Sequence, residues 1–251
     1  MKTDLKEKFI KIRDKGWIKS KRNDSSGIGY TFEQLLNIEE NSFFIADYEE
    51  IEIKTHRTNS MEKIHLFRLT PDGDYLFPIK SIIEELGYTD KKNKKFKVFR
   101  KRFNSIRFTR INNNTFAKIE VKRKQKKIYF IIVRNHKRYP LYISWSFEEL
   151  EKRINLKIKN LAIIEAESFI SKINGKEYFL YSKYSLYRIK SFEKFIELIE
   201  NGMITISFNI GYHKEENKLG MIKDHGTSFS INLNNINNLY DLIDEERDVK
   251  K

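Results

Sequence analysis

The feature that most constrains this chain is a set of charged residues spaced D-x4-E-x-K, formed by Asp47, Glu52 and Lys54. Residues of a β-strand alternate between its two faces, so Glu52 and Lys54 share one face while Ile51 and Ile53 share the other. Asp47 comes just ahead of the strand. Two carboxylates and a lysine can therefore meet at one point. The spacing predicts a site that holds a hard divalent cation and orients a water molecule.

Such a site suits phosphodiester hydrolysis, which requires an in-line water and charge relief on the phosphoryl oxygens. We expect Asp47 and Glu52 to be direct ligands of Mg²⁺, with the backbone carbonyl of Ile53 as a third, because Mg²⁺ keeps most of its waters. Lys54 is expected beside the attacking water and the scissile phosphate. Glu33 is expected to support Lys54 or the waters of the metal. The alternative is an ordinary charged strand in which Glu52 pairs with nearby lysines at the surface.

The charge of the chain indicates a polyanionic partner. The formal net charge is +14 and the pI is about 9.6, as expected of a protein that binds nucleic acid. The alternative is a merely soluble, lysine-rich protein from an AT-rich genome. The absence of cysteine excludes disulfides and thiolate metal sites, and we expect a cytoplasmic protein.

Membrane insertion and nucleotide-driven movement are not expected. The N-terminal residues are charged and lack an apolar signal core. The longest apolar run, residues 128–133, is far shorter than a membrane span. No G-x-x-x-x-G-K-[ST] loop occurs, so we do not expect ATP-driven translocation within this chain.

The order of expected elements predicts a mixed α/β fold. Apolar spacing and capping residues predict helices over residues 3–16, 31–39, 79–86, 146–156 and 192–200. Alternating apolar residues predict strands over residues 43–57, 64–69, 116–133 (as a hairpin), 141–145, 161–166, 178–184, 203–212 and 227–233. The charged tail, residues 241–251, is expected to fray. Intermingled helices and strands indicate an α/β or α+β sandwich with helices around a central mixed β-sheet.

A basic stretch spans residues 91–110 and contains no acidic residue. Phenylalanines are interleaved with its lysines and arginines: Phe96, Phe99, Phe103 and Phe108. Either this is a solvated face over a few buried aromatics, or the basic side chains track DNA phosphates while the phenylalanines pack inward. The lack of compensating acids favours the second interpretation. We expect Arg100 and Arg102 to contact DNA.

The histidines are His56, His65, His136, His213 and His225. Most isolated histidines are structural or solvated. His56 shares the face of Glu52 and Lys54, which places it near the predicted metal. His213 and His225 flank the loop of residues 214–224, but no third ligand at suitable spacing completes a metal site. We therefore expect both to contact bases or phosphates.

Several segments together resemble the MvaI/BcnI-type restriction endonucleases, which belong with MutH among the PD-(D/E)-x-K nucleases. The first carriers of the resemblance are Gly27-Ile-Gly-Tyr-Thr-Phe-Glu33 and the D-x4-E-x-K set itself. The segments 142–147 and 161–167 are similar to the middle of the family. Ile210-Gly-Tyr-His213 and Lys223-Asp-His-Gly-Thr-Ser-Phe-Ser-Ile-Asn232 are similar to its C-terminal part. The resemblance covers nearly the whole chain, in order.

The resemblance implies an enzyme that cuts double-stranded DNA at a CC-centred pentanucleotide, with CCWGG, CCSGG or CCNGG as candidate targets. It implies metal ligation by Asp47 and Glu52, catalysis by Lys54, and an accessory acidic role for Glu33. It also implies a PD-(D/E)-x-K core with two lobes around a DNA cleft, a monomeric enzyme, and a cognate DNA methyltransferase as genetic partner. We place the catalytic lobe in residues 1–140 and the recognition lobe in residues 141–251.

The resemblance also indicates residues that face DNA. In the C-terminal segment these are Asp224, His225 and Thr227, and His213 lies in the segment before it. Lys21 and Arg22 precede the glycine-containing segment and fit the family pattern. Some relatives carry a basic residue where Ser230 stands, which leaves the reading of the central base pair open between the candidate targets.

Two other functions remain open at this point. A MutH-like repair enzyme has the same catalytic set but nicks one strand, usually at hemimethylated GATC, and depends on a mismatch-repair partner. A basic DNA-binding module would bind DNA without cleaving it, and its acidic residues would be accidental. Cleavage of both strands by the protein alone favours restriction over both alternatives.

Overall fold

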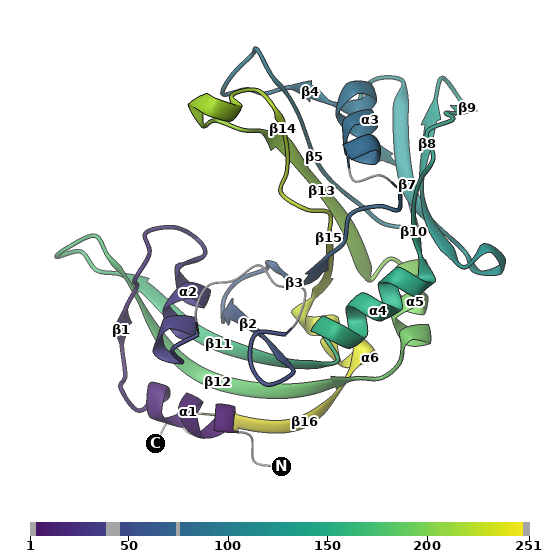
Figure 1. Cartoon of the computed structure of the whole chain (residues 1–251). Coiled ribbons are helices and arrows are strands. Elements are labelled where there is room, and N and C mark those ends of the chain that lie inside the picture. Colours follow the sequence, from purple (N-terminus) through teal and green to yellow (C-terminus); the bar gives the residue numbers. More distant parts are fainter. Residues whose placement is uncertain (1–3, 39–45, 74–75, 248–251) are drawn as a thin grey trace. The chain divides into compact units, whose positions relative to one another are not determined.

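The computed structural model describes residues 4–38, 46–73 and 76–247, which form two compact units (Figure 1). Unit 1 contains Met1–Ile64, Ile154–Lys190 and Leu239–Lys251, and unit 2 contains His65–Arg153 and Ser191–Asn238. Each unit is therefore built from separate stretches of the chain. The division expected at residues 140 and 141 does not coincide with these units, because it separates two strands that pair in unit 2. The expected start of a strand at residue 43 lies outside the described residues.

Unit 1 is a mixed sheet with two helices. The helices are α1 (Asp4–Arg13) and α2 (Gly27–Leu35). The strands are β1 (Ile18–Lys19), β2 (Ile51–Arg57), β11 (Asn160–Ile170), β12 (Glu177–Ile189) and β16 (Tyr240–Arg247). Their order is β1-β12-β11-β2, with β16 on β12. β2 runs parallel to β11 and ends this path, while β12 is antiparallel to its neighbours.

The core of unit 1 lies between the helices and one face of the sheet. Buried side chains of α1 and α2 pack with Ile51 and Ile53 of β2 and with apolar residues of β11 and β12. Leu5, Phe9 and Phe32 are fully buried in this cluster. Residues of β2 with even numbers point to the opposite face. The helices therefore cover the face that does not carry the predicted catalytic carboxylate and lysine.

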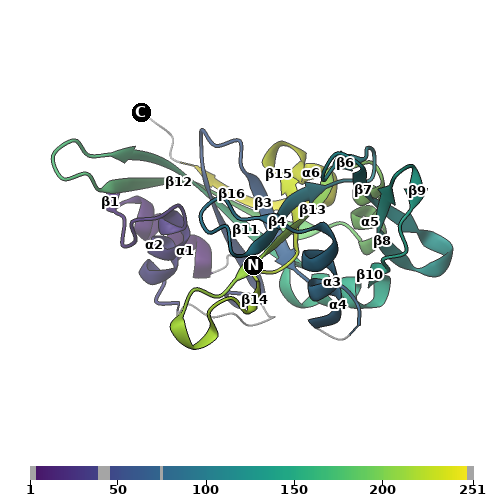
Figure 2. The same cartoon turned by 90° about the horizontal axis from the view of Figure 1, so that it is seen from above.

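Two parts of unit 1 differ from the sequence-based expectation. The expected helix at residue 31 begins earlier, at Gly27, because Thr31 does not cap it: the Thr31 hydroxyl accepts a hydrogen bond from the Lys21 N–H at 3.0 Å. Residues 241–247 of the tail expected to fray belong to β16, since Lys6 and Arg13 of α1 bind Asp244 at 2.7 Å and Glu246 at 2.8 Å, and residues 248–251 lie outside the described residues. In both views, the β11–β12 hairpin extends past α2 (Figures 1 and 2).

Unit 2 holds two further sheets. One has the order β3-β15-β13-β5-β4, with β14 on β13, and the other has β10-β8-β7-β6, with β9 on β8. The strands of the first are β3 (Lys63–Arg68), β4 (Tyr88–Thr89), β5 (Lys97–Phe103), β13 (Ile204–Tyr212), β14 (Ile222–Asp224) and β15 (Ser228–Asn232). The strands of the second are β6 (Thr109–Arg110), β7 (Thr115–Lys122), β8 (Lys127–Arg134), β9 (Lys137–Arg138) and β10 (Ile143–Ser146).

Aromatic side chains fill the core of unit 2. Phe103 of β5 contacts Phe130 of β8 edge-on, with ring centroids 4.8 Å apart, and Phe208 of β13 lies 4.9 Å from Phe130. Its helices are α3 (Leu76–Leu86), α5 (Phe192–Glu200), α6 (Ile236–Leu239) and α4 (Phe147–Lys157), whose last residues belong to unit 1. The mixed α/β fold expected from the sequence is confirmed. No helix in the described ranges is long and apolar enough to cross a membrane.

Candidate active site

A tight turn leads into β2 and sets the position of Asp47. The Tyr48 N–H donates to the Ile51 carbonyl at 3.0 Å, and Glu49 and Glu50 have φ values of 42° and 67°. Two successive residues with positive φ are typical of a turn that matches the twist of a strand. Asp47 thereby returns to the strand, where its Oδ2 accepts a hydrogen bond from the Ile53 N–H at 3.1 Å. The turn therefore brings the Asp47 side chain close to β2.

Glu52 and Lys54 lie side by side on β2, as the alternation predicts. The Glu52 side chain is 1% exposed, and its Oε1 accepts a hydrogen bond from the Lys54 ammonium. Burial raises the pKa of Glu52; the positive charge of Lys54 opposes this shift, the nearby charge of Asp47 adds to it, and the charge of Lys157 opposes it. The structure therefore brings Asp47, Glu52 and Lys54 together at one edge of the sheet.

A second lysine joins this site and was not predicted from the sequence. Lys157 is the last residue of α4, and its Nζ lies 3.0 Å from Oε2 of Glu52 and 3.9 Å from Oδ1 of Asp47. Its side chain is 17% exposed. No spacing rule links residue 157 to the D-x4-E-x-K set. Only the pairing of β11 with β2, directly after this helix, brings it close.

The donor set fits a hard divalent cation. Oε2 of Glu52 is buried and makes no hydrogen bond of standard geometry within the described chain, although the Lys157 ammonium is near. An ionised carboxylate oxygen in that position needs a cation. The N–H of Ile53 points to the open edge of β2, toward Asp47, and its carbonyl points to the same side because both groups of a strand residue do so. Carboxylate and carbonyl oxygens are the ligands that Mg²⁺ prefers.

Glu33 lies near β2, and His56 lies on β2 itself. Glu33 lies on α2, and Gly29 separates it from β2: a side chain at Gly29 would come 3.3 Å from Oγ1 of Thr55 and 3.8 Å from Oε1 of Glu33. The Gly27–Gly29 segment is the first turn of α2, and its glycines allow close packing. His56 is buried, and its Nε2 lies 3.1 Å from the Glu62 carbonyl.

In unit 2, one face of the β15-β13-β5 sheet is polar. Arg100 and Arg102 alternate with the buried Phe99 and Phe103 on β5, so they point away from the core. Their register partners on β13 are Asn209 and Ser207, and Nε of Arg102 donates to Oγ of Ser207 at 3.1 Å. Further along β13, Ser207 is paired with Ser228 of β15. We call the residues Arg100, Arg102, Ser207, Asn209, Ser228 and Ser230 the polar sheet face.

The loop after β14 places Asp224 and His225 at the end of this sheet. The Asp224 carboxylate accepts from the Gly226 N–H at 2.8 Å, and the His225 N–H donates to the Asn209 carbonyl at 2.9 Å. Burial raises the pKa of Asp224. Desolvation, followed by the charges of Lys223 and Arg100, lowers the pKa of His225. Both predicted residues therefore lie beside the polar sheet face.

Arg68 belongs to the same cluster and was not predicted. It follows His65 on β3 and is exposed, and its side chain packs on Gly226: a Cβ built there would lie 2.5 Å from its Cδ. Gly226 has a φ of +93°. His213 directly follows β13 and is held by Glu215, whose Oε2 lies 3.1 Å from its Nδ1.

Thr227 and Ser230, both expected to face DNA, are completely buried. The Ser230 hydroxyl lies 3.1 Å from Nδ1 of His65, and the Ser228 hydroxyl lies 2.7 Å from the same nitrogen. His65 is exposed. The structure therefore puts His65, which the sequence left without a role, above two serines of β15.

Lys21 and Arg22 lie in unit 1, directly before α2. Lys21 is exposed, and the Arg22 guanidinium stacks over the Tyr30 ring at 3.9 Å from its centroid. The Ser20 hydroxyl donates to the Arg22 carbonyl at 2.6 Å, which fixes this turn. A side chain at Gly27 would lie 2.8 Å from that carbonyl, so glycine permits the close approach.

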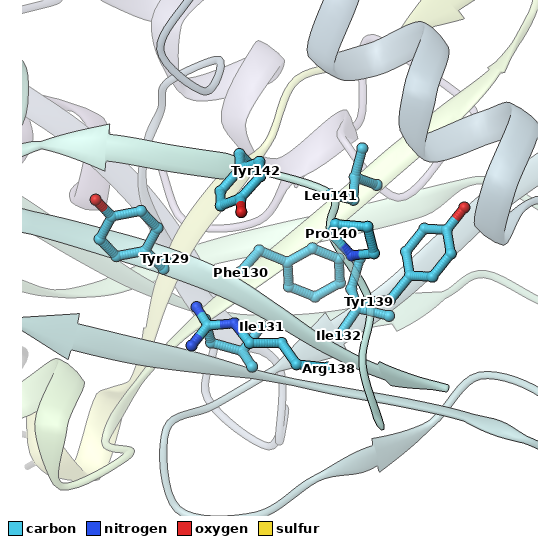
Figure 3. A pocket seen from close by; sticks show the side chains of 9 residues that line it. All are labelled: Tyr129, Phe130, Ile131, Ile132, Arg138, Tyr139, Pro140, Leu141 and Tyr142. Atoms are coloured by element: carbon cyan, nitrogen blue, oxygen red, sulfur yellow. The ribbon is translucent and has the colours of Figure 1, made fainter. Parts of the chain in front are cut away.

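A separate pocket of about 140 Å³ lies in unit 2 against β8 (Figure 3). Tyr129, Arg138, Tyr139, Pro140 and Tyr142 are among the residues that line it. None of the residues expected at the active site or at the DNA contacts lines this pocket. It is therefore distinct from the candidate active site.

Comparison with known proteins shows similarity over nearly the whole chain. The model of the MvaI/BcnI restriction endonuclease family matches residues 6–240. The structure is similar to that of the restriction endonuclease MvaI in complex with its cognate DNA substrate, with 29% sequence identity and a TM-score of 0.85 over 95% of this chain and 96% of that chain. It is similar to MvaI in the absence of DNA, with 27% identity and a TM-score of 0.60 over 95% of each chain. No curated protein matches the sequence.

Proposed function

Because the chain belongs to the MvaI/BcnI restriction endonuclease family, it is a type II site-specific deoxyribonuclease, and we propose that it cuts double-stranded DNA in a Mg²⁺-dependent reaction at a CC-N-GG type pentanucleotide. The candidate targets are CCWGG, CCSGG and CCNGG. The observation that carries the metal-dependent part is that the Asp47 and Glu52 carboxylates meet at the edge of β2, where Oδ1 of Asp47 and Oε2 of Glu52 remain after the hydrogen bonds that the other two oxygens accept.

Asp47 and Glu52 would hold Mg²⁺ through Oδ1 and Oε2, with the Ile53 carbonyl as a third ligand. Asp47 is already oriented for this, since its other oxygen is fixed by the Ile53 N–H at 3.1 Å. A bound Mg²⁺ supplies Lewis acidity to the scissile phosphate and lowers the pKa of a water. Two carboxylates and one carbonyl are enough, because Mg²⁺ retains several of its waters.

Lys54 would orient the attacking water and neutralise a phosphoryl oxygen. Its ammonium is held by Glu52 and is partly exposed, so it is both fixed in position and accessible to DNA. A cation that is held before the substrate arrives requires little reorganisation when charge develops on the phosphate. Glu33, on α2 near β2, is proposed to have a supporting acidic role.

We propose that unit 1 is the catalytic unit and unit 2 the recognition unit, in place of a division at residue 140. The polar sheet face, with Arg68, Asp224 and His225 beside it, offers arginine, asparagine and histidine side chains that suit base edges and phosphates. Ser230 is buried, so we propose that it affects base reading by orienting His65. His213, Lys21 and Arg22 are proposed phosphate contacts, and buried Thr227 is proposed to shape the loop.

We propose that the enzyme acts as a monomer, cuts the two strands in successive events, and has a cognate DNA methyltransferase as genetic partner. These properties follow the family. A monomer with one active site, here the proposed site in unit 1, can cut only one strand at a time and must therefore cut the two strands in succession.

The test is a digest of unmethylated phage DNA by purified protein, with Mg²⁺ and with EDTA, followed by sequencing of the fragment ends. Discrete double-strand breaks that require Mg²⁺ are expected, and their ends give the target and its central base pair. Glu52→Gln, which keeps the shape of the side chain, is expected to stop cleavage, whereas Glu62→Gln at an exposed position is the matched control. Single-strand nicks alone would favour a MutH-like activity, and DNA binding with no cleavage under any metal would refute the proposal.

A further inference from the structure

Lys157 lies beside the two carboxylate oxygens that are proposed to bind the metal. Its ammonium is 3.0 Å from Oε2 of Glu52 and 3.9 Å from Oδ1 of Asp47. These are the two oxygens that remain after the other interactions of the site, because Oε1 of Glu52 binds Lys54 and Oδ2 of Asp47 binds the Ile53 N–H. Each oxygen of the Glu52 carboxylate is therefore close to one lysine: Oε1 to Lys54 and Oε2 to Lys157.

The surrounding structure holds the Lys157 backbone firmly. Ile158, the next residue, is fully buried, and its N–H donates to the Ile154 carbonyl at 2.9 Å. The Ile158 carbonyl accepts a hydrogen bond from the buried Tyr240 hydroxyl at 3.2 Å. The end of a helix also favours a positive side chain. The flexible part is therefore the lysine side chain itself, which reaches the carboxylates from a fixed position.

An ammonium at this position would compete with a divalent metal for these oxygens. Mg²⁺ binds carboxylate oxygens at roughly 2.0–2.1 Å, so on the same oxygens it would lie within a few ångströms of the Lys157 ammonium, which is 3.0 Å from Oε2 of Glu52. Two positive charges that close together repel in a largely buried site. Metal binding at these oxygens therefore favours departure of the Lys157 ammonium.

We propose that Lys157 is a built-in counter-cation that neutralises Asp47 and Glu52 in the metal-free enzyme, is displaced when the metal binds, and thereby sets the metal affinity. This inference rests on the proposed metal site. It predicts the sign of a mutational effect, because removing the ammonium removes a competitor and leaves the site more negative. If Lys157 instead held the carboxylates in place for the metal, its removal would weaken metal binding.

The experiment measures binding of Mn²⁺ alone to the full-length protein without DNA, by electron paramagnetic resonance and calorimetry. Lys157→Met keeps the apolar stem and removes the charge, and Lys157→Gln is a second variant in case the first does not fold. Both are expected to bind Mn²⁺ at least about tenfold more tightly than the wild type. Lys159→Met, two residues away and exposed, is the control and is expected to bind as the wild type does.

Two further variants separate this inference from the proposed function. Glu52→Ala is expected to lose Mn²⁺ binding; retained binding would refute the metal site at β2 whatever Lys157 does. Lys157→Arg keeps a positive charge and is expected to bind no more tightly than the wild type. The inference would be overturned if Lys157→Met and Lys157→Gln both bind Mn²⁺ no more tightly than the wild type. It would also be overturned if neither these variants nor the wild type bind Mn²⁺.

Discussion

Gly226→Ala tests whether Arg68 contacts DNA, because Gly226 is the surface on which Arg68 rests. Gly226 has a φ of +93°, and an alanine Cβ there would lie 2.5 Å from Cδ and 3.2 Å from Cγ of Arg68. The first distance is about 1 Å shorter than a favourable carbon–carbon contact, so the arginine must move. The variant therefore combines backbone strain with displacement of one exposed cation.

The variant Gly73→Ala separates the backbone strain from the displacement of the arginine. Gly73 has a φ of +110°, and no atom lies within 4 Å of its ideal Cβ. A left-handed alanine costs about 1–2 kcal/mol, and both variants should show this destabilisation. For a chain of this size, that corresponds to roughly 2–8 °C in the melting temperature. Only Gly226→Ala should also weaken target affinity, by roughly 5- to 150-fold if Arg68 makes one specific contact worth about 1–3 kcal/mol.

The assay is fluorescence anisotropy with a target duplex and a random duplex in EDTA, together with thermal unfolding by circular dichroism. Gly226→Ala should weaken binding of the target duplex more than that of the random duplex, while Gly73→Ala binds both as the wild type does. Equal DNA affinities for the two variants would refute the argument, because they would show that the position of Arg68 has no effect on DNA.

Three other predictions follow from the site. Lys54→Ala should lower the single-turnover cleavage rate by about 10²- to 10⁴-fold with an unchanged dissociation constant for DNA, and a parallel loss of affinity would show a binding role instead. Arg100→Gln and Arg102→Gln should each reduce the slope of log K against log salt by about 0.9 for each phosphate that the protein no longer neutralises, whereas Lys11→Gln on α1 should leave it unchanged. Desolvation holds the pKa of His225 below its ordinary value, so its stabilising contribution is complete above about pH 6.5 and is lost as the pH falls toward the folded-state pKa. The melting temperature of His225→Gln should therefore fall less than that of the wild type between pH 7.5 and pH 5.5, and an equal fall would contradict this assignment.

The parts of the fold that were predictable are those encoded locally. The Ser191 hydroxyl accepts from the Lys194 N–H at 3.0 Å, as its capping position predicts, and α5 begins at the next residue. The β7–β8 hairpin follows from alternation and a polar turn. The convergence of Asp47, Glu52 and Lys54 was also predictable, because it needs only one strand and the turn before it. Each of these depends on interactions between residues close in sequence.

The parts that were missed depend on contacts distant in sequence. Residues 241–247 carry too many charges to predict a strand by themselves, and they belong to β16 because α1 supplies Lys6 and Arg13 as partners. Arg68 lies beside the polar sheet face only because β3 pairs with β15. The alternation of residues on β5 correctly predicted that Arg100 and Arg102 point away from the core. The sequence did not predict that Asn209 of β13 pairs with Arg100.

The burial of Glu52 shows that the D-x4-E-x-K residues alone do not supply all the charge that this carboxylate needs. A buried, unpaired carboxylate costs several kcal/mol, so a fully buried Glu52 on β2 would destabilise the fold without cations beside it. Lys54 provides one cation from the same strand, but it reaches only Oε1. The second oxygen depends on Lys157, which arrives with the helix that precedes β11. In the metal-free protein, the charge of the candidate active site that the sequence encodes in eight residues is therefore balanced in part by a lysine distant in sequence.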